Sequence, residues 1–340
     1  MELPKTYRKL VAARLTPHFR EAAEVVEEPL APPGPGEILV RNLIAGVNAT
    51  DVNIAAGRYD PGAKPPLDLG IEAAGEIVSV GPEVTDLKPG DFVVTAETGG
   101  GYRAYHTLPA KRAIPVPAAT PEAVSLVVSG LTASIALHVA GEMGSGETVL
   151  VTAAAGGTGQ YAVQLAKLAG NHVIGTCGTP EKAEMLRSLG CDRVINYREE
   201  DVRSVLASEY PNGVDLVYES VGGEMFDVSL RALAVHGRLL TIGFISEYVG
   251  GVETVRRPRI YTQLLPKSAS VRGFFLPHFT GHMREHMMRL IMLLSEGKLR
   301  IAVDPTPFEG LDAVVDAVEY LHSGKSRGKV VVRFPALDKP

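Results

Sequence analysis

Three glycines interrupt an apolar segment, VLVTAAAGGTGQYAVQLAKLAG, that occupies residues 149–170. Residues 149–152 form a short, mostly β-branched run, typical of a strand buried on both faces of a parallel sheet. Beyond the glycines, small and apolar residues from Ala162 to Ala169 recur at helical spacing. The segment is therefore predicted to be a strand, a tight turn and a helix.

The glycine turn, Gly157-Thr158-Gly159-Gln160-Tyr161-Ala162, fits the G-x-G-x-x-G/A pattern of dinucleotide-binding folds. We expect Gly157 to permit the turn, Gly159 to let the backbone approach a pyrophosphate and Ala162 to let helix and strand pack closely. With Gly156, these glycines are predicted to bind the cofactor at the helix N-terminus, where N–H groups favour anions. A glycine-rich turn without a ligand is the alternative.

The second strand of the nucleotide-binding unit indicates which dinucleotide is bound. NAD-binding units usually carry an Asp or Glu at its end to hold the ribose, but here Cys177 and Gly178 stand there. Thr179 and Pro180 are predicted as the N-cap and first residue of the next helix. Lys182 then lies in the first helical turn, where a cation is disfavoured unless an anion faces it. A 2′-phosphate would be that anion, which predicts NADP(H); a solvated lysine is the alternative.

Composition sets the wider limits. The chain has 340 residues, 45% of them hydrophobic, a net charge of −5 and a pI of about 6.0, so two packed domains fit and no nucleic-acid partner is indicated. Two cysteines, Cys177 and Cys191, are too few for a disulfide framework. We find neither a secretory signal nor a membrane span, and expect a cytoplasmic protein without a membrane partner.

The order of expected elements predicts an α/β fold with two domains. Residues 1–120 carry short β-like runs separated by Pro and Gly, typical of an antiparallel, barrel-like domain. From about Pro121, strands alternate with helices, which predicts a doubly wound parallel sheet. We expect a Rossmann domain over residues 125–276, inserted in a first domain that comprises residues 1–124 and 277–340.

Several long segments add a resemblance to a known family. LTPHFREA, GVNATDVNIAAGRYDP, VTAAAGGTGQ, LGCDRVINY, VYESVGGEMFD, GRLLTIGFIS, KSASVRGFFL and GKSRGKVVV together resemble the zinc-free, quinone oxidoreductase-like medium-chain dehydrogenase/reductases. The resemblance implies a GroES-like, β-barrel-type catalytic domain beside the Rossmann domain. It also implies NADPH-dependent reduction of the carbon–carbon double bond of an enone, such as a 15-oxo-prostaglandin, and a homodimer.

Carried over position by position, the resemblance implies a set of cofactor contacts. Gly178 and Lys182 would lie at the 2′-phosphate and Tyr197 near the adenosine end. Gly178 departs from the small hydroxyl residue common there in relatives. The other implied contacts are Thr158, Ser220, Ile242, Tyr248, Phe274, Phe275, Leu276 and Ser326.

Three residues are candidates for the chemistry. Hydride addition to an enone creates an enolate, so the site must supply hydrogen bonds where charge develops on oxygen. Tyr248 is the first candidate donor, with packing on the cofactor ribose as its alternative. Asn48 and Tyr59 match the first-domain face of the cleft in relatives; Asn48 would hold the nicotinamide or the substrate oxygen, or else form an Asx turn before Asp51. Asp51 is expected to support structure.

No metal is expected. A catalytic zinc needs about three Cys, His or carboxylate ligands, and Asn48 and Ile71 stand where zinc-dependent relatives have a Cys and a His. The spacing of His278, His282 and His286 resembles a metal site, but with Thr280 as N-cap only two would share a helix face. We interpret them as polar residues of the helix.

Two other functions remain open. The same cofactor and site would serve an NADPH:quinone oxidoreductase, which a comparison of enones with quinones distinguishes. A crystallin-like or RNA-binding protein that retains NADPH is an alternative of another class, although no basic, aromatic-interleaved patch supports nucleic-acid binding. A peroxisomal location in a eukaryote is a further alternative, but the sequence has no C-terminal SKL-type signal.

Overall fold

A computed structural model describes residues 3–335 of the chain as two compact units. Unit 1 contains the residues up to Val128 and those from Val303 onward, and unit 2 contains Ser129–Ala302. The Rossmann boundaries predicted from sequence, 125 and 276, differ from this division. The first differs by a few residues and the second by a whole helix, because that helix packs within unit 2.

Unit 1 is built from antiparallel sheets. One has three strands in the order β2-β1-β4, and the other follows β15-β3-β5-β6-β8, with β7 also paired to β3. Buried aliphatic side chains of Ile38, Val40, Ile77, Val93 and Leu108 form its core. The strands are β1 (Thr6–Ala12), β2 (Ala23–Pro29), β3 (Glu37–Gly46), β4 (Leu67–Asp68), β5 (Glu72–Val80), β6 (Phe92–Ala96), β7 (Tyr105–Pro109), β8 (Ile114–Val116) and β15 (Val331–Arg333).

The helices of unit 1 are short. They are α1 (Phe19–Ala22), α2 (Asp51–Ala55), η1 (Ala110–Arg112), α3 (Pro121–Ser125), η7 (Leu311–Ala313) and α11 (Val314–His322). The helical segment from Leu311 to His322 consists of the 3-10 turn η7 followed by α11.

Unit 2 contains a parallel six-stranded sheet in the order β11-β10-β9-β12-β13-β14. In chain order this is 3-2-1-4-5-6, the order of a Rossmann fold, with its direction of winding reversed between β9 and β12. The predicted doubly wound sheet is therefore confirmed. The strands are β9 (Thr148–Val151), β10 (His172–Cys177), β11 (Arg193–Asn196), β12 (Val214–Glu219), β13 (Leu233–Thr241) and β14 (Ser270–Gly273).

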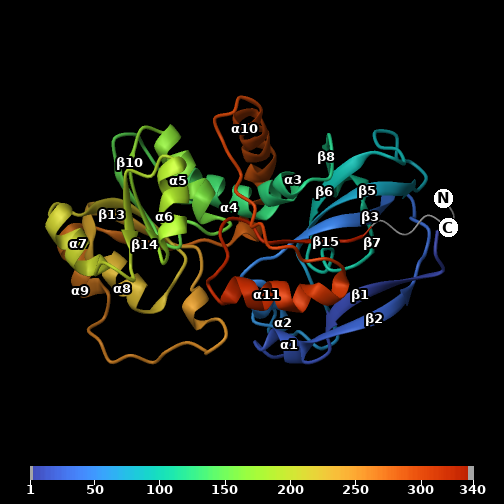
Figure 1. Ribbon diagram of the computed structural model, residues 1–340, viewed down its shortest axis with the longest axis horizontal. Coiled ribbons are helices and arrows are strands. Elements are labelled where there is room, and N and C mark those ends of the chain that lie inside the picture. The colour runs from blue at the N-terminus through green and yellow to red at the C-terminus, as the bar shows by residue number, and fades with distance from the viewer. Residues whose placement is uncertain (1–2, 336–340) are drawn as a thin grey trace. The chain divides into compact units, whose positions relative to one another are not determined.

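Helices follow the strands of this sheet (Figure 1), and α6 and α7 begin at side-chain caps. The Thr179 hydroxyl accepts a hydrogen bond from the Lys182 backbone N–H, so the predicted cap of α6 is present. Asp201 caps α7 in the same way. The helices after β9 are α5 (Gly159–Leu168), α6 (Pro180–Ser188), α7 (Val202–Glu209), α8 (Gly223–Arg231), η4 (Ile245–Glu247), α9 (Tyr261–Leu264), η5 (Leu265–Lys267), η6 (Leu276–His282) and α10 (Met283–Ser295).

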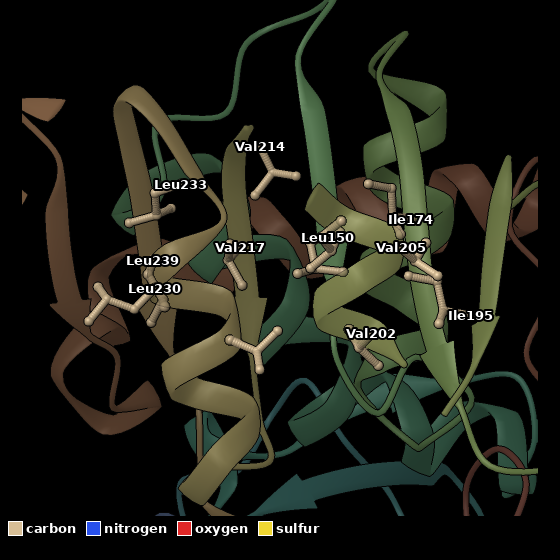
Figure 2. Close-up of a cluster of buried hydrophobic side chains, with 12 residues drawn as sticks. Leu150, Ile174, Ile195, Val202, Val205, Val214, Val217, Leu230, Leu233 and Leu239 are labelled. Carbon is tan, nitrogen blue, oxygen red and sulfur yellow. The ribbon is translucent and has the colours of Figure 1, made fainter. Parts of the chain in front are cut away.

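Each strand from β9 to β13 contributes to a buried aliphatic cluster. Figure 2 shows Leu150, Ile174 and Ile195 on neighbouring strands, beside Val202 and Val205 of α7. The residues of this cluster are at most 9% exposed, and a buried aliphatic side chain contributes roughly 1.5–3 kcal/mol. Burial of this layer accounts for the aliphatic, often β-branched residues on this face of the strands.

Because helix α10 belongs to unit 2, the chain returns to unit 1 at Val303 instead of after the predicted boundary at 276. We expected a helix from about Thr280, but Thr280 lies in η6 and α10 begins after His282. His286 of α10 is 5% exposed, and its Nδ1 lies 2.7 Å from the Ser134 hydroxyl of α4 (Leu131–Ile135). A side chain on Gly130 would contact Leu290 at 3.0 Å. These contacts place α10 in unit 2.

Among the described residues, one helical run is long and apolar enough to cross a membrane. It is Pro121–Ala140, with a mean hydropathy of 1.8, and 72% of its most apolar window is buried. A core helix that is mostly buried has the same length and composition. The run consists of α3 (Pro121–Ser125), η2 (Leu126–Gly130), α4 and η3 (Ala136–Ala140).

Candidate functional site

The glycine turn joins β9 to α5 at the carboxyl edge of the sheet in unit 2. Ala153, just before the glycines, has a left-handed backbone, with φ of 47°. A side chain on Gly159 would meet Ala153 O at 2.5 Å and Ala154 Cα at 2.7 Å. Gly159 is therefore required by the close packing of α5 on the turn, and its approach to a pyrophosphate stays a prediction.

Three predicted cofactor residues follow adjacent strands at the same edge. Ser220 follows β12, Ile242 follows β13 and Phe274 follows β14, and the Ile242 and Phe274 amides donate to Glu219 O at 2.7 Å and Thr241 O at 3.0 Å. The Ser220 hydroxyl is buried, with no hydrogen-bond partner among the described residues. An unpaired buried hydroxyl fits a site that a polar ligand completes.

Sequence analysis missed a buried acid at this edge. Glu219 is 0% exposed and accepts hydrogen bonds from the Thr152 hydroxyl and the Val221 and Gly222 amides. Burial raises the pKa of its carboxyl above the ordinary value, although these donors oppose the shift. The carboxyl thereby fixes the turn after β12. Its signal in the sequence was a charge at the end of the apolar run VDLVYE.

The residues predicted at the 2′-phosphate lie together. Gly178 follows β10 and Tyr197 follows β11, and the Tyr197 amide donates to Cys177 O at 3.0 Å. Lys182 lies in the first turn of α6 and lowers the pKa of the Cys177 thiol, although burial raises it overall. This end of the sheet thus combines an aromatic ring, a cation and a bare backbone position, a set of groups that fits the adenosine end of a phosphorylated dinucleotide.

Tyr248 lies in the loop after β13. The side chain is 5% exposed, and its hydroxyl accepts a hydrogen bond of 3.4 Å from the Phe244 amide. The Phe244 and Tyr248 rings pack edge to face, with centroids 4.7 Å apart. Because a phenol oxygen can accept this bond and still donate its own proton, both predicted roles of Tyr248 are compatible with the loop.

The FFL segment continues from β14. Phe274 is 8% exposed and stacks on Phe279, with ring centroids 4.8 Å apart. Phe275 is 39% exposed and lies edge to face with His278, while Leu276 opens η6. Their contact with the cofactor stays a prediction.

In unit 1, Asn48 belongs to a buried polar network that sequence analysis did not anticipate. Its Nδ2 donates to Glu72 Oε1 at 2.9 Å and to Gly46 O at 3.3 Å, and its Oδ1 accepts from Lys329 Nζ at 2.8 Å. Lys329 and Glu72 are 1% and 0% exposed, with 2.5 Å between Nζ and Oε1. These partners use both N–H groups of the Asn48 side chain and one of the two acceptor sites of Oδ1, so donating a hydrogen bond to a substrate, which stays a prediction, would require one of these bonds to be exchanged.

Asp51 extends this network. Its Oδ2 accepts hydrogen bonds from the Asn48 backbone N–H at 2.8 Å and from the Tyr102 hydroxyl at 2.5 Å, which supports the structural role expected for Asp51. The turn therefore relies on the Asp51 carboxyl rather than on the Asn48 side chain. Burial raises the pKa of Asp51 to about 7, while the bonds from Tyr102 and Asn48 and the charge of Lys329 act against burial.

The remaining predicted residues of unit 1 lie on loops. The Tyr59 ring is 47% exposed, and its hydroxyl lies 2.5 Å from Thr50 Oγ1 and accepts from Asn53 Nδ2 at 3.1 Å. Ser326 lies between α11 and β15 and is partly exposed. Nothing described here tests their predicted roles.

Over residues 3–335, no group of three or more His, Cys, Asp or Glu side chains is arranged to hold a metal ion. The His282 and His286 rings lie 6.3 Å apart, centroid to centroid. The pKa of His286 is lowered by burial, and its Nδ1 is used by Ser134. At the two positions that carry zinc ligands in metal-dependent relatives, this chain has Asn48, whose side-chain amide is hydrogen-bonded to Gly46, Glu72 and Lys329, and Ile71, whose side chain is apolar.

Comparisons with known proteins agree with the two units. The model for "Alcohol dehydrogenase GroES-like domain" matches residues 34–118, and that for "Zinc-binding dehydrogenase" matches residues 157–292. The chain is 48% identical to prostaglandin reductase-3 of Mus musculus, covering 98% of this chain and 91% of that protein. It is 45% identical to a probable quinone oxidoreductase of Leishmania amazonensis, over 98% and 100% of the two chains.

A solved structure agrees with the cofactor prediction. Quinone oxidoreductase of Escherichia coli, determined in complex with NADPH, superposes with a TM-score of 0.83 at 31% identity and covers 96% of this chain and 99% of its own. Together, these findings define an NADP(H)-dependent oxidoreductase with a GroES-like and a Rossmann domain. The chain belongs to the medium-chain dehydrogenase/reductase superfamily, quinone oxidoreductase-like branch.

Removal of the Lys329 ammonium should destabilise the protein strongly. Lys329→Met leaves the Glu72 carboxylate buried without its cation, which typically costs 3–5 kcal/mol. Adding Glu72→Gln to this variant should recover part of the loss, since the unpaired carboxylate of residue 72 is then removed. The measurement is the urea midpoint of each variant, with Arg8→Met of the exposed Arg8–Asp312 pair as the control. A loss no larger than in the control would contradict the importance of the buried pair.

Asp51 should make stability depend on pH. Because its folded pKa, about 7, lies above the ordinary value of 3.8, its contribution is complete below pH 4 and is lost as the pH rises towards 7, by up to about 1.4 kcal/mol per pH unit. Asp51→Asn should therefore gain stability relative to the parent protein between pH 5 and pH 7. Thermal unfolding of both proteins across this range checks it, and parallel profiles would contradict it.

Proposed function

We propose that this protein reduces the carbon–carbon double bond of α,β-unsaturated ketones with NADPH, adding hydride to the β-carbon without a metal. The observation that carries the proposal is the carboxyl edge of the parallel sheet, where the glycine turn, the unpaired Ser220 hydroxyl and the Gly178–Lys182–Tyr197 group lie at successive strand ends. The substrate class is supported by the prostaglandin reductase-3 relatives.

NADPH, when bound, supplies the hydride, and the protein must bind the cofactor and stabilise the charge that develops on the substrate oxygen. Lys182 would hold the 2′-phosphate of bound NADPH through a charge-assisted contact, and Ser220, Ile242 and Phe274, which follow β12, β13 and β14, would line the cofactor site. Tyr248 donates its phenol proton as a hydrogen bond to the enolate oxygen, while the Phe244 amide keeps the hydroxyl in place. A neutral donor suits a buried position because it carries no desolvated charge.

Reduction of quinones is the second candidate. It is supported by the probable quinone oxidoreductase of Leishmania amazonensis and by the E. coli enzyme, and it needs the same cofactor edge. For assembly and location, we propose a cytoplasmic homodimer that binds neither nucleic acid nor membrane. The family resemblance supports the dimer, and the net charge of −5 gives no attraction to nucleic acid or anionic lipid.

A substrate panel tests the proposed function. NADPH oxidation is followed with linear and cyclic enones, enals and quinones at equal concentrations. Enones should have the highest kcat/KM, and the product should carry deuterium at the β-carbon when deuterated NADPH is the donor. Higher kcat/KM for quinones would support the second candidate instead.

Tyr248→Phe keeps the ring and deletes the hydroxyl. Loss of one donor to a developing oxyanion typically lowers turnover by about 10²–10³-fold; a loss near tenfold fits a donor assisted by water or a ribose hydroxyl. The measurement is single-turnover NADPH oxidation at saturating enone, together with NADPH affinity, and Tyr261→Phe, at an exposed residue that begins α9, serves as control. Normal chemistry with weakened NADPH binding would make Tyr248 a cofactor contact only.

The reaction should not depend on zinc. Elemental analysis of the purified protein should find no stoichiometric zinc, and prolonged treatment with a chelator should leave kcat unchanged. One zinc per chain, together with activity lost on chelation and restored by zinc, would refute the metal-free mechanism.

A further inference from the structure

Gly178 and Tyr197 contact each other across two adjacent strands. Strands β10 and β11 are parallel, with Cys177 opposite Asn196, so the residues that follow them emerge side by side. A Cβ atom built on Gly178 would lie 2.5 Å from Tyr197 Oη, 2.7 Å from Cζ and 3.0 Å from Cε2. The hydroxyl end of the phenol therefore occupies the space that any other residue at position 178 would need.

Backbone conformation does not explain the glycine. Gly178 has no φ in the left-handed region, unlike Gly170 and Gly190 nearby, so an alanine or serine could adopt its backbone. The contact with the phenol is the feature that a side chain would disturb. Tyr197 is 50% exposed, so its ring can move into solvent with little cost to the fold.

The phenol lies next to the proposed anion site. Its hydroxyl end lies over Gly178, one residue before the Thr179 cap of α6, and Lys182 is in the first turn of that helix. A phenol O–H and an ammonium group can both donate to a phosphate. The position of the ring thus decides whether its hydroxyl can reach an anion held by Lys182.

We propose that Gly178 is a positioning residue for cofactor choice: the absence of its side chain seats the Tyr197 hydroxyl at the 2′-phosphate and so favours NADPH over NADH. The inference rests on the NADP(H) site described above. A serine at position 178 adds a hydroxyl that could donate to the phosphate, so on its own it would be expected to strengthen NADPH binding. We expect the opposite, because its side chain displaces the Tyr197 phenol.

The test compares Gly178→Ser, Tyr197→Ala and the double variant, using calorimetric titration of the full chain with NADPH and with NADH. Gly178→Ser should weaken NADPH binding about 10-fold, equivalent to about 1.4 kcal/mol, and change NADH binding less than twofold. Its unfolding temperature should be unchanged, because the ring can swing outward. Gly281→Ser is the matched control, since a side chain there meets nothing within 4 Å.

The double variant separates displacement of Tyr197 from a direct effect of serine. With Tyr197 already replaced by alanine, Gly178→Ser should cause no further loss. An equal loss in both backgrounds, equal losses for both cofactors, or unchanged NADPH affinity of Gly178→Ser would overturn the inference.

Lys182→Ala distinguishes failure of the inference from failure of the cofactor site. It should weaken NADPH binding by about 10- to 100-fold and leave NADH nearly unchanged. If the parent protein binds NADPH no better than NADH and Lys182→Ala has no effect, the 2′-phosphate site itself is wrong. If Lys182→Ala behaves as expected while Gly178→Ser does not, only the role of Gly178 fails.

Discussion

Unit 1 depends on satisfying one buried charge pair, Lys329 with Glu72. Two ions without water are stable only if their remaining hydrogen-bonding capacity is met. Here the Lys329 ammonium donates to the Val47 carbonyl and to Asn48 Oδ1, while the Glu72 carboxylate accepts from Asn48 Nδ2 and from the Val128 backbone N–H. Val47 and Asn48 follow β3, Glu72 begins β5, and Lys329 lies just before β15. The pair thus joins parts of unit 1 that lie far apart in the sequence.

The sequence predicts the fold well where periodicity reports burial. Short apolar, β-branched runs followed by capped helices indicate a parallel sheet covered by helices, and the Thr179 cap is where residue types indicate. The later domain boundary was not predictable in the same way. The amphipathic pattern of α10 says that one face is buried, but not that His286 packs against Ser134.

The candidate site was predictable where a sequence motif determines the backbone conformation. It was not predictable where side chains that are far apart in the sequence contact each other. Lys329 and Glu72 each stand in an apolar run, GKVVV and GIEAAGEIV, and a charge within such a run signals a buried partner. Their pairing, however, spans more than 250 positions. At the glycine turn, the pattern predicted strand, turn and helix, but the left-handed residue is Ala153 and Gly159 is needed for close packing.

Gly46 shows what the buried pair demands of the residues around it. A Cβ atom at this position would overlap the Glu72 carboxylate, so any larger residue there requires a shorter one at position 72. That change would remove the carboxylate that faces the Lys329 ammonium or, with aspartate, draw it back. A substitution at position 46 is therefore coupled to changes at positions 72 and 329. A mutant library that varies the three positions together can reach an apolar replacement for the whole arrangement, which a library that varies them one at a time cannot.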